Sequence, residues 1–169
     1  IYYSSIGKNS LLLLNLPPDK RGLIHENDIS SLMNMKRILG KTFEKNLLEK
    51  AVSSTGEIGD LTDGRLETYW QGSGKTNTIE ISFEGEEEFD RLLLQENITE
   101  GQRIERFTLE CQVGDTWQMI TEGTTVGYKR ILRFAPVRCN KVRIVVSESR
   151  DLPQLSEIGF YKASEEEQE

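Results

Sequence analysis

Carboxylates are the most numerous side chains in this sequence that could do chemistry. The chain of 169 residues holds 28 Asp and Glu against 21 Lys and Arg, and four glutamates, Glu84, Glu86, Glu87 and Glu88, crowd around Gly85. Two carboxylates can act as general acid and base when a rigid site holds them beside a substrate. These four lie between two segments with strand periodicity, so a solvated hairpin loop is favoured over a catalytic pair.

The single histidine and the two cysteines add little reactive chemistry. His25 stands beside Glu26 and Asp28, where polar residues begin a helix, and this helix-start interpretation is favoured over a catalytic histidine. Cys111 has the parity of the core-facing positions around it, whereas Cys139 lies in a turn whose register is not fixed. Two buried or half-buried free thiols are favoured over one disulfide, because free cysteine behaves as a small hydrophobic residue.

The charge of the chain limits the classes of partner. A formal net charge of -7 argues against nucleic acid or an anionic membrane, which would repel this field. No apolar run approaches the roughly 20 residues that span a bilayer. The triplet Asn97-Ile98-Thr99 fits the N-glycosylation acceptor pattern, which matters only in a secreted eukaryotic protein.

An apolar segment near the start of the chain requires neighbours. Four consecutive leucines, Leu11 to Leu14, follow a polar turn and end before Pro17 and Pro18. Such a run is typical of a strand buried on both faces of a parallel sheet, and such a strand cannot exist alone. We therefore expect these residues to be the end of something larger.

A helix is predicted after the leucines. Apolar residues recur at helical spacing from about Asn27 to Lys45, with Asn27 and Asp28 as caps. The apolar positions are Ile29, Leu32, Met33, Ile38, Leu39 and Phe43. Burial of each of these side chains would stabilise the protein, so we expect another structural element to pack against this face of the helix.

The hydrophobic period changes from helical to two at Thr78. Alternating runs at 79–83 and 107–113, with shorter ones at 92–95, 117–121, 130–134, 142–146 and 158–161, predict antiparallel strands. Many short strands separated by turn residues predict a jelly-roll sandwich. The Ser, Thr and Gly residues between Leu47 and Gly59 mark a domain boundary, and the acidic residues 164–169 predict a disordered tail.

Several motifs carry a family resemblance. The segment from Gly7 to Asp19, followed by Gly22-Leu23-Ile24 and a helix, resembles the last barrel strand and helix of the α-L-fucosidase family of retaining glycoside hydrolases. The segments Asp63-Gly64 with Tyr69-Trp70, 101–104, 123–130 and 156–161 resemble that family's C-terminal discoidin-type sandwich. Together these segments extend over nearly the whole chain.

The resemblance implies a mainly β fold. A discoidin-like jelly-roll β-sandwich is expected over residues 49–163. The closing βα unit of a (β/α)8 catalytic barrel precedes it at 1–48, because a whole barrel takes about 250 residues. A disordered acidic tail follows at 164–169.

The resemblance also implies an activity for the larger enzyme. The family hydrolyses α-linked L-fucose from glycans by retaining double displacement, and both catalytic carboxylates lie on earlier barrel strands. We therefore expect no catalytic residue in this chain and no activity from it alone. The expected partners are the remainder of the barrel and fucosylated glycans, and the expected location is periplasmic or secreted.

Two other function classes are weighed against this one. The first is a free-standing carbohydrate-binding or discoidin module with no enzymatic role, in which residues 1–48 have no function of their own. The second is an adhesion or lipid-binding discoidin domain. The lipid version predicts exposed apolar loop tips, and the loops at 71–77 and 122–129 are mostly polar, so it is the weakest.

The discoidin resemblance supplies a candidate cation site. Asp63, Thr68 and Glu157 resemble the ring that binds a structural cation in such modules, and ligation by oxygen alone suits Ca2+. A simple tight turn at Asp63-Gly64 explains the same residues equally well. No organic cofactor is implied.

The same resemblance supplies candidates for binding carbohydrate. Trp70, Glu96, Asn97 and Arg103 are the best polar and aromatic residues for this role. Related sugar-binding modules often carry an arginine in the loop after the strand at 92–94, and here that loop lacks one, which weakens the prediction. Trp70 is favoured as a core residue over a sugar-stacking one.

Overall fold

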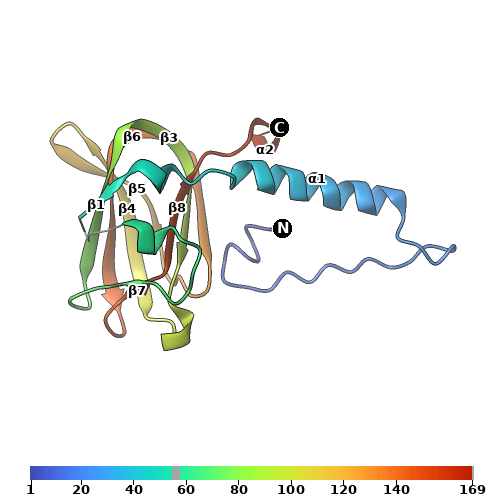
Figure 1. The fold of residues 1–169 in the computed structure, drawn as a ribbon, viewed down its shortest axis with the longest axis horizontal. Helices are drawn as coiled ribbons and strands as arrows, with labels where there is room; N and C mark the ends of the chain where they lie inside the picture. Colours follow the sequence, from blue (N-terminus) through green and yellow to red (C-terminus); the bar gives the residue numbers. More distant parts are fainter. Residues whose placement is uncertain (55–57, 169) are drawn as a thin grey trace.

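The computed structural model describes residues 1–54 and 58–168 and has two parts, a β-sandwich and an elongated projection (Figure 1). The strands are β1 (Val52–Ser53), β2 (Trp70–Gln71), β3 (Asn77–Gln95), β4 (Ile104–Val113), β5 (Thr116–Gly123), β6 (Arg130–Ser149), β7 (Gln154–Leu155) and β8 (Glu157–Tyr161). The helices are α1 (Glu26–Thr42) and α2 (Glu165–Gln168), with short 3-10 turns η1 (Leu47–Lys50), η2 (Ile58–Leu61) and η3 (Ile98–Glu100).

Two long strands build the sandwich. β3 and β6 pair antiparallel along nearly their whole length, and their register shifts between Ser82 and Glu87 and again between Phe89 and Arg91. These irregularities let each strand bend, so that each strand forms part of both layers of the sandwich. The sheet order is β1-β3-β6-β4-β5, β8 pairs with the second half of β3, and β2 pairs with β7 in a separate ribbon. The mainly β sandwich predicted from the sequence is confirmed.

Alternating apolar residues from both layers fill the core. Phe89, Phe107 and Phe160 are fully buried, and Phe89 meets Phe160 edge-on with ring centroids 5.0 Å apart. Edge-to-face contacts of this kind add stability beyond the area that they bury. The hairpin loop predicted around Gly85 is wrong, because residues 79–83 and 92–95 belong to the single strand β3. The glutamates lie at its first bulge, where Glu84 and Glu86 are exposed and Glu87 and Glu88 are half-buried.

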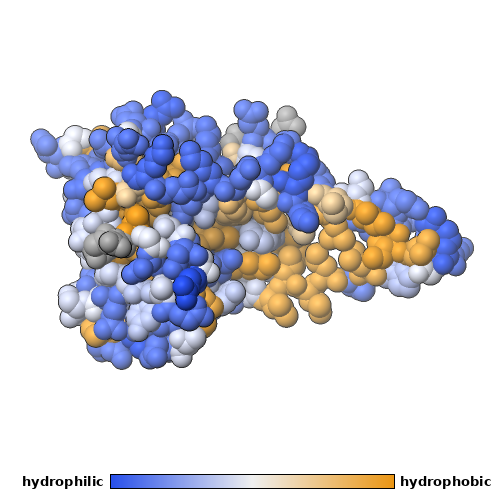
Figure 2. All heavy atoms as spheres, viewed as in Figure 1, coloured by the Kyte–Doolittle hydropathy of each residue, from blue (hydrophilic) through white to orange (hydrophobic). Residues whose placement is uncertain are grey.

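The projection consists of the leucine segment, which runs away from the sandwich, and α1, which runs back toward it (Figure 1). The leucine segment, defined as residues 10–18, is extended and has no strand partner among the described residues. Leu11 and Leu13 are each 88% exposed, and Figure 2 shows an apolar surface along this part of the molecule. A strand forms only when neighbours accept its backbone hydrogen bonds, so the expected strand is absent here.

α1 begins and ends close to the prediction. His25 is the N-cap instead of Asn27 or Asp28, since its Nδ1 accepts a hydrogen bond from the Asn27 N–H. The helix ends at Thr42, three residues before the predicted Lys45. Thr42 is the buried residue of this helix. The predicted apolar face is partly covered, since Ile29 and Met33 are 47% and 58% exposed, whereas Leu32, Ile38, Leu39 and Phe43 are half-buried.

The first nine residues contact the sandwich, although they lie on the other side of the boundary predicted at residue 48. Tyr2, Tyr3 and Phe43 pack against a second cluster formed by Leu93, Ile131 and Tyr161. The Ile131 N–H donates to the Gly7 carbonyl at 2.8 Å, and Lys8 forms a bridge with Arg130. Contacts to the sandwich therefore come from both ends of the segment 1–48.

The acidic end of the chain also differs from the prediction. Residues 165–168, expected to be disordered, form the short helix α2, and two of its glutamates make ion pairs with basic residues. Sequence composition alone could not identify those distant partners. Glu169 lies outside the described residues.

Candidate functional site

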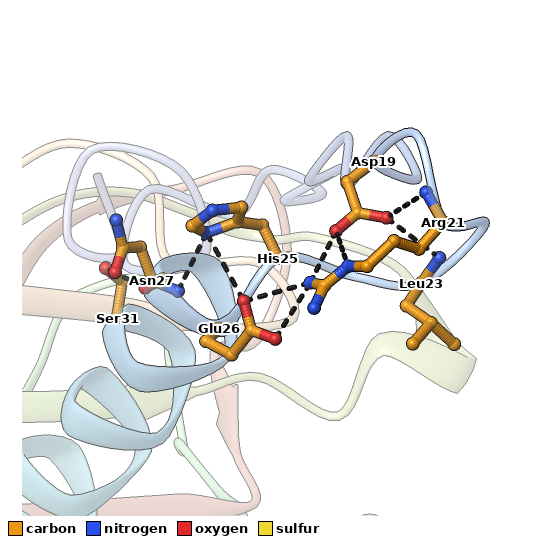
Figure 3. A network of polar contacts seen from close by, with 7 residues as sticks. All are labelled: Asp19, Arg21, Leu23, His25, Glu26, Asn27 and Ser31. Carbon is orange, nitrogen blue, oxygen red and sulfur yellow. Dashed lines mark hydrogen bonds and ion pairs between the residues drawn. The ribbon is translucent and has the colours of Figure 1, made fainter.

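The turn between the leucine segment and α1 is a rigid, exposed cluster of charges (Figure 3). Asp19 Oδ1 accepts the Arg21 N–H at 2.8 Å, and Arg21 Nε donates to Asp19 Oδ2 at 2.8 Å. The Arg21 guanidinium also donates to both carboxylate oxygens of Glu26, at 2.8 and 3.0 Å. Gly22 adopts a φ of 77°, which closes the turn without strain.

These charges satisfy one another. The hydrogen bond from Arg21 lowers the pKa of Asp19. The structural role predicted for this turn therefore explains its residues, and His25 serves the helix start as expected. In a barrel, a loop that follows the carboxyl end of a strand faces the active site, so this turn would lie on that side.

The fold brings the three predicted cation ligands into one place. Thr68 Oγ1 donates to Asp63 Oδ2 at 2.7 Å, and Asp63 Oδ1 accepts the Arg65 N–H at 2.9 Å. Glu157, from the far end of the chain, accepts the Gly64 N–H at 3.0 Å. A residue at the start of β8 thus meets a loop located more than ninety positions earlier.

The electrostatics of this loop suit a cation. Burial raises the pKa of Glu157, and the charge of Asp63 raises it further against the opposing Gly64 N–H. The hydrogen bond from Thr68 lowers the pKa of Asp63. Two carboxylates that repel each other beside a hydroxyl form an oxygen donor set of the type that Ca2+ prefers. Among the described residues, no group of three or more His, Cys, Asp or Glu side chains could hold a metal ion, so any site here needs Thr68 or backbone oxygens.

Glu96 is a structural residue in the sandwich interior. Its side chain is 1% exposed, and its Oε1 accepts the N–H groups of Arg103 and Ile104, both at 2.8 Å. Its Oε2 accepts the Gly127 N–H at 2.6 Å. Burial raises the pKa of this carboxyl, and the three backbone donors oppose the rise. Glu96 thereby ties the loop after β3 to the loop before β6.

The other three carbohydrate candidates are also engaged internally. Asn97 is 2% exposed and donates to Gln154 Oε1 at 3.2 Å, while Arg103 donates to the Leu152 carbonyl at 2.9 Å. Trp70 is half-buried against the core, as its favoured interpretation requires. Trp70 and Asn97 lie at the same end of the sandwich, linked through Gln154 and its partner Gln71. The sugar-binding role of these residues stays a prediction, and their internal bonds do not favour it.

Both cysteines are buried and free, in agreement with the favoured interpretation. The turn predicted at Cys139 is wrong, because Cys139 lies within β6 and is paired with Glu87 of β3. Burial, together with the neighbouring Cys111, raises the pKa of Cys139 far above its ordinary value. A buried protonated thiol is a poor nucleophile. These thiols therefore act as core residues.

Sequence reasoning missed Asn46, which joins η1 to β8. Its Nδ2 donates to the Ile158 carbonyl at 2.9 Å, and its Oδ1 accepts the Phe160 N–H at 3.1 Å. Its Oδ1 also caps η1 at the Leu48 N–H. An Asn directly before an apolar pair is a recognisable cap, but the Ile158 partner of Asn46 lies 112 residues away.

The fold and these contacts define a β-sandwich domain that is joined to an extended leucine segment and the helix α1. The chain is 37% identical to Alpha-L-fucosidase 1 of Arabidopsis thaliana over 177 residues, which cover 95% of this chain and 35% of that protein. A putative α-L-fucosidase from Bacteroides thetaiotaomicron superposes with a TM-score of 0.90 at 33% identity, covering 97% of this chain and 39% of that one. A GH29 fucosidase from Ruminococcus gnavus in complex with fucose gives a TM-score of 0.88 at 32% identity, covering 97% and 36%.

The chain therefore matches the C-terminal part of an α-L-fucosidase of the GH29 type. It spans about a third of the length of the relatives that it matches. No protein-family model matches it. CBM32 domains from Clostridium perfringens superpose over 68% of the chain with a TM-score of 0.57 at 18% identity, a likeness of fold alone.

Proposed function

We propose that the chain works as part of an α-L-fucosidase that removes α-linked L-fucose from glycans with retention of configuration. The observation that carries this proposal is the pairing of a well-packed sandwich with a leucine segment that has no strand partner in the part of the chain that the structure describes. The relatives that share both parts are named as fucosidases. The described residues supply the sandwich and the unit that would close a barrel.

The chemistry then belongs to the rest of the enzyme. A retaining glycosidase needs a nucleophile and an acid/base, both carboxylates, held about 5 Å apart across the sugar. This chain would contribute one wall of the barrel and the charged turn on its active-site side. Fucosylated glycans are the proposed substrates, and a periplasmic or secreted location is proposed with them. No described helix is long and apolar enough to cross a membrane.

The geometry favours a supporting role for the sandwich over a role in shaping the substrate pocket. The sandwich contacts residues 2–9, which precede the leucine segment, and Phe43, which follows α1. The charged turn lies at the other end of the projection (Figure 1). Because barrel active sites lie at the carboxyl ends of the strands, the sandwich would support the opposite face.

An activity assay tests the proposal. The chain alone should not turn over an aryl α-L-fucoside, and adding the preceding part of the enzyme as a second polypeptide should restore turnover. Leu13→Glu should prevent this association, because Leu13 is 88% exposed here and would enter the barrel sheet. Met119→Glu is the matched control, since Met119 is 64% exposed on β5 of the sandwich.

Two outcomes would contradict this proposal. One is turnover by the purified chain alone that is lost when one of its own carboxylates is mutated. The other is equal assembly of the Leu13→Glu and Met119→Glu variants with the preceding part.

We also propose a structural Ca2+ held by Asp63, Thr68 and Glu157. Calcium that binds only the folded state should stabilise it by about 2.7 kcal/mol at a hundredfold excess over Kd, and chelator should remove the gain. Glu157→Gln should abolish the calcium-dependent rise in melting temperature, while Glu67→Gln, an exposed change in the same loop, should keep it. A melting curve unchanged by calcium and chelator would leave Asp63-Gly64 as a turn only.

A further inference from the structure

The acidic helix α2 lies across the junction between α1 and the sandwich. Glu166 accepts a hydrogen bond from Lys41 Nζ at 2.8 Å and pairs with the Arg37 guanidinium, so one carboxylate holds two basic side chains of α1. Glu167 accepts from Arg91 NH2 at 3.0 Å and from Thr42 Oγ1 at 2.8 Å. Adjacent residues of α2 thus bind both the projection and β3.

Arg91 is the buried anchor on the sandwich side. It is 8% exposed, and its NH1 lies 3.2 Å from Asp90 Oδ1, a carboxylate that also accepts the Ala163 N–H. Its Nε donates to the Tyr3 hydroxyl at 3.2 Å. A buried guanidinium is costly unless it is paired. Arg91 has two carboxylate partners, Asp90 beside it in β3 and Glu167 from α2, so Asp90 still pairs with it when Glu167 is changed.

α1 has few other attachments to the sandwich. Thr42 is its buried residue, and Phe43 just beyond it meets Tyr161 edge-on at 5.0 Å. The aromatic contact fixes one point at the end of the helix. Phe43 also meets Tyr2 and Tyr3, with ring centroids 6.2 and 6.3 Å apart. This aromatic cluster holds the end of the 17-residue helix, whereas the Glu166 contacts reach back one further turn to Arg37.

We propose that α2 is a clasp that fixes the orientation of α1 on the sandwich, with Glu167 as its inner residue and Glu166 as its outer one. The inner residue joins the buried Arg91 to Thr42, and the outer one holds Lys41 and Arg37. Release of the clasp would free the helix to pivot about Phe43 while the sandwich stays folded. The clasp is a property of the junction and does not depend on the activity of the larger enzyme.

The chain offers a matched control within the same helix. Glu165 carries the same charge in α2, is exposed, and has no hydrogen bond or ion pair among the described contacts. The variants E165Q, E166Q and E167Q therefore remove one identical charge at three neighbouring positions. Any effect of net charge is the same in all three.

Hydrogen exchange of backbone amides, followed by mass spectrometry on the full chain, tests the clasp. E167Q should speed exchange in the last turns of α1 by about tenfold or more, since hydrogen bonds to charged groups contribute most when buried. E166Q, which loses exposed ion pairs, should speed it about two- to fivefold. E165Q should change it less than twofold, and the paired strands β3 and β6 should be unaffected in all three.

Two results would overturn the clasp. One is equal exchange of α1 in E165Q and E167Q. The other is faster exchange of β3 and β6 to the same degree as α1 in E167Q, which would make Arg91 and Glu167 a stabilising pair of the sandwich only. Ending the chain after Ala163 gives a second variant, which should reproduce E167Q in α1 without melting the strands.

Discussion

The sandwich and the projection contain the same kinds of apolar residue, but the sandwich buries them and the projection leaves several of them exposed. Leu92, in the second half of β3, is fully buried, and Leu13, in the leucine segment, is 88% exposed. The sandwich holds all the strands that its core needs, whereas the leucine segment has no strand beside it among the described residues. The comparison teaches that hydrophobic patterning specifies burial only when the covering elements belong to the same folded unit.

The largest expected effect is a direct test of this contrast. Leu92→Ala should destabilise the chain by about 2–5 kcal/mol, because it leaves a cavity in a close-packed core. Leu13→Ala should change the free energy of unfolding by less than about 0.5 kcal/mol, as is usual for exposed positions. Urea denaturation of both variants measures the two values. Similar losses in both would mean that the leucine segment is covered in solution.

The contrast between buried and exposed positions can also be tested at the polar residue Glu96, which connects the loops after β3 and before β6. Glu96→Gln should cost about 1–3 kcal/mol, because the amide NH2 group would face a backbone N–H that the carboxylate accepted. Glu100→Gln is the control, since the Glu100 side chain is 56% exposed in the same loop region. Thermal melting monitored by circular dichroism measures both. Equal melting temperatures for the two variants would show that Glu96 is replaceable.

A smaller effect is expected where the two regions meet. Gly127 has a φ of 64°, and a Cβ there would lie 2.3 Å from Asn9 Nδ2. Gly114 has a φ of 59° with nothing within 4 Å of a Cβ. Alanine at either position costs about 1 kcal/mol for the backbone conformation, and only Gly127→Ala should add a loss from displacing Asn9. Denaturation midpoints that fall equally would show that the Asn9 contact contributes nothing.

The smallest effect is a difference in pH dependence between the clasp and the core. Burial raises the pKa of Glu167, but hydrogen bonds from Tyr3, Arg91 and Thr42 outweigh it, and the pKa lies below the ordinary 4.5. Its contribution to stability is therefore present above 4.5 and lost as pH falls through the folded value. Burial leaves the pKa of Glu96 above 4.5, so its contribution is complete below 4.5 and lost as pH rises through the folded value.

Melting temperatures measured between pH 3 and pH 7 should show these opposite signs. The penalty of E167Q should shrink as pH falls, and the penalty of E96Q should shrink as pH rises. If the losses in melting temperature caused by E167Q and E96Q changed with pH in the same direction, the assignment of Glu167 to the clasp and Glu96 to the core would be contradicted.

The fold was more predictable than the site. Period-two patterning located β4 and β8, because each of these strands buries one face. It also located parts of β3 and β6 but divided each of these long strands into two. Asp63, Thr68 and Glu157 were chosen by resemblance, and the structure places them together. Glu96 and Asn97 were chosen as surface residues because they are polar, but their hydrogen-bond partners are backbone groups and side chains far along the chain, so they lie inside.

The sequence by itself determined the local features of this protein. The strand periodicity, the helix from near His25 to Thr42 and the buried cysteines follow from residue types within a short window. Only the tertiary structure decided that residues 2–9 return to the sandwich, that the acidic end of the chain docks on Arg91, and that the leucines stay uncovered. The physical reason is that these features depend on partners distant in sequence, and a charge or an apolar side chain is satisfied only by what the completed fold places beside it.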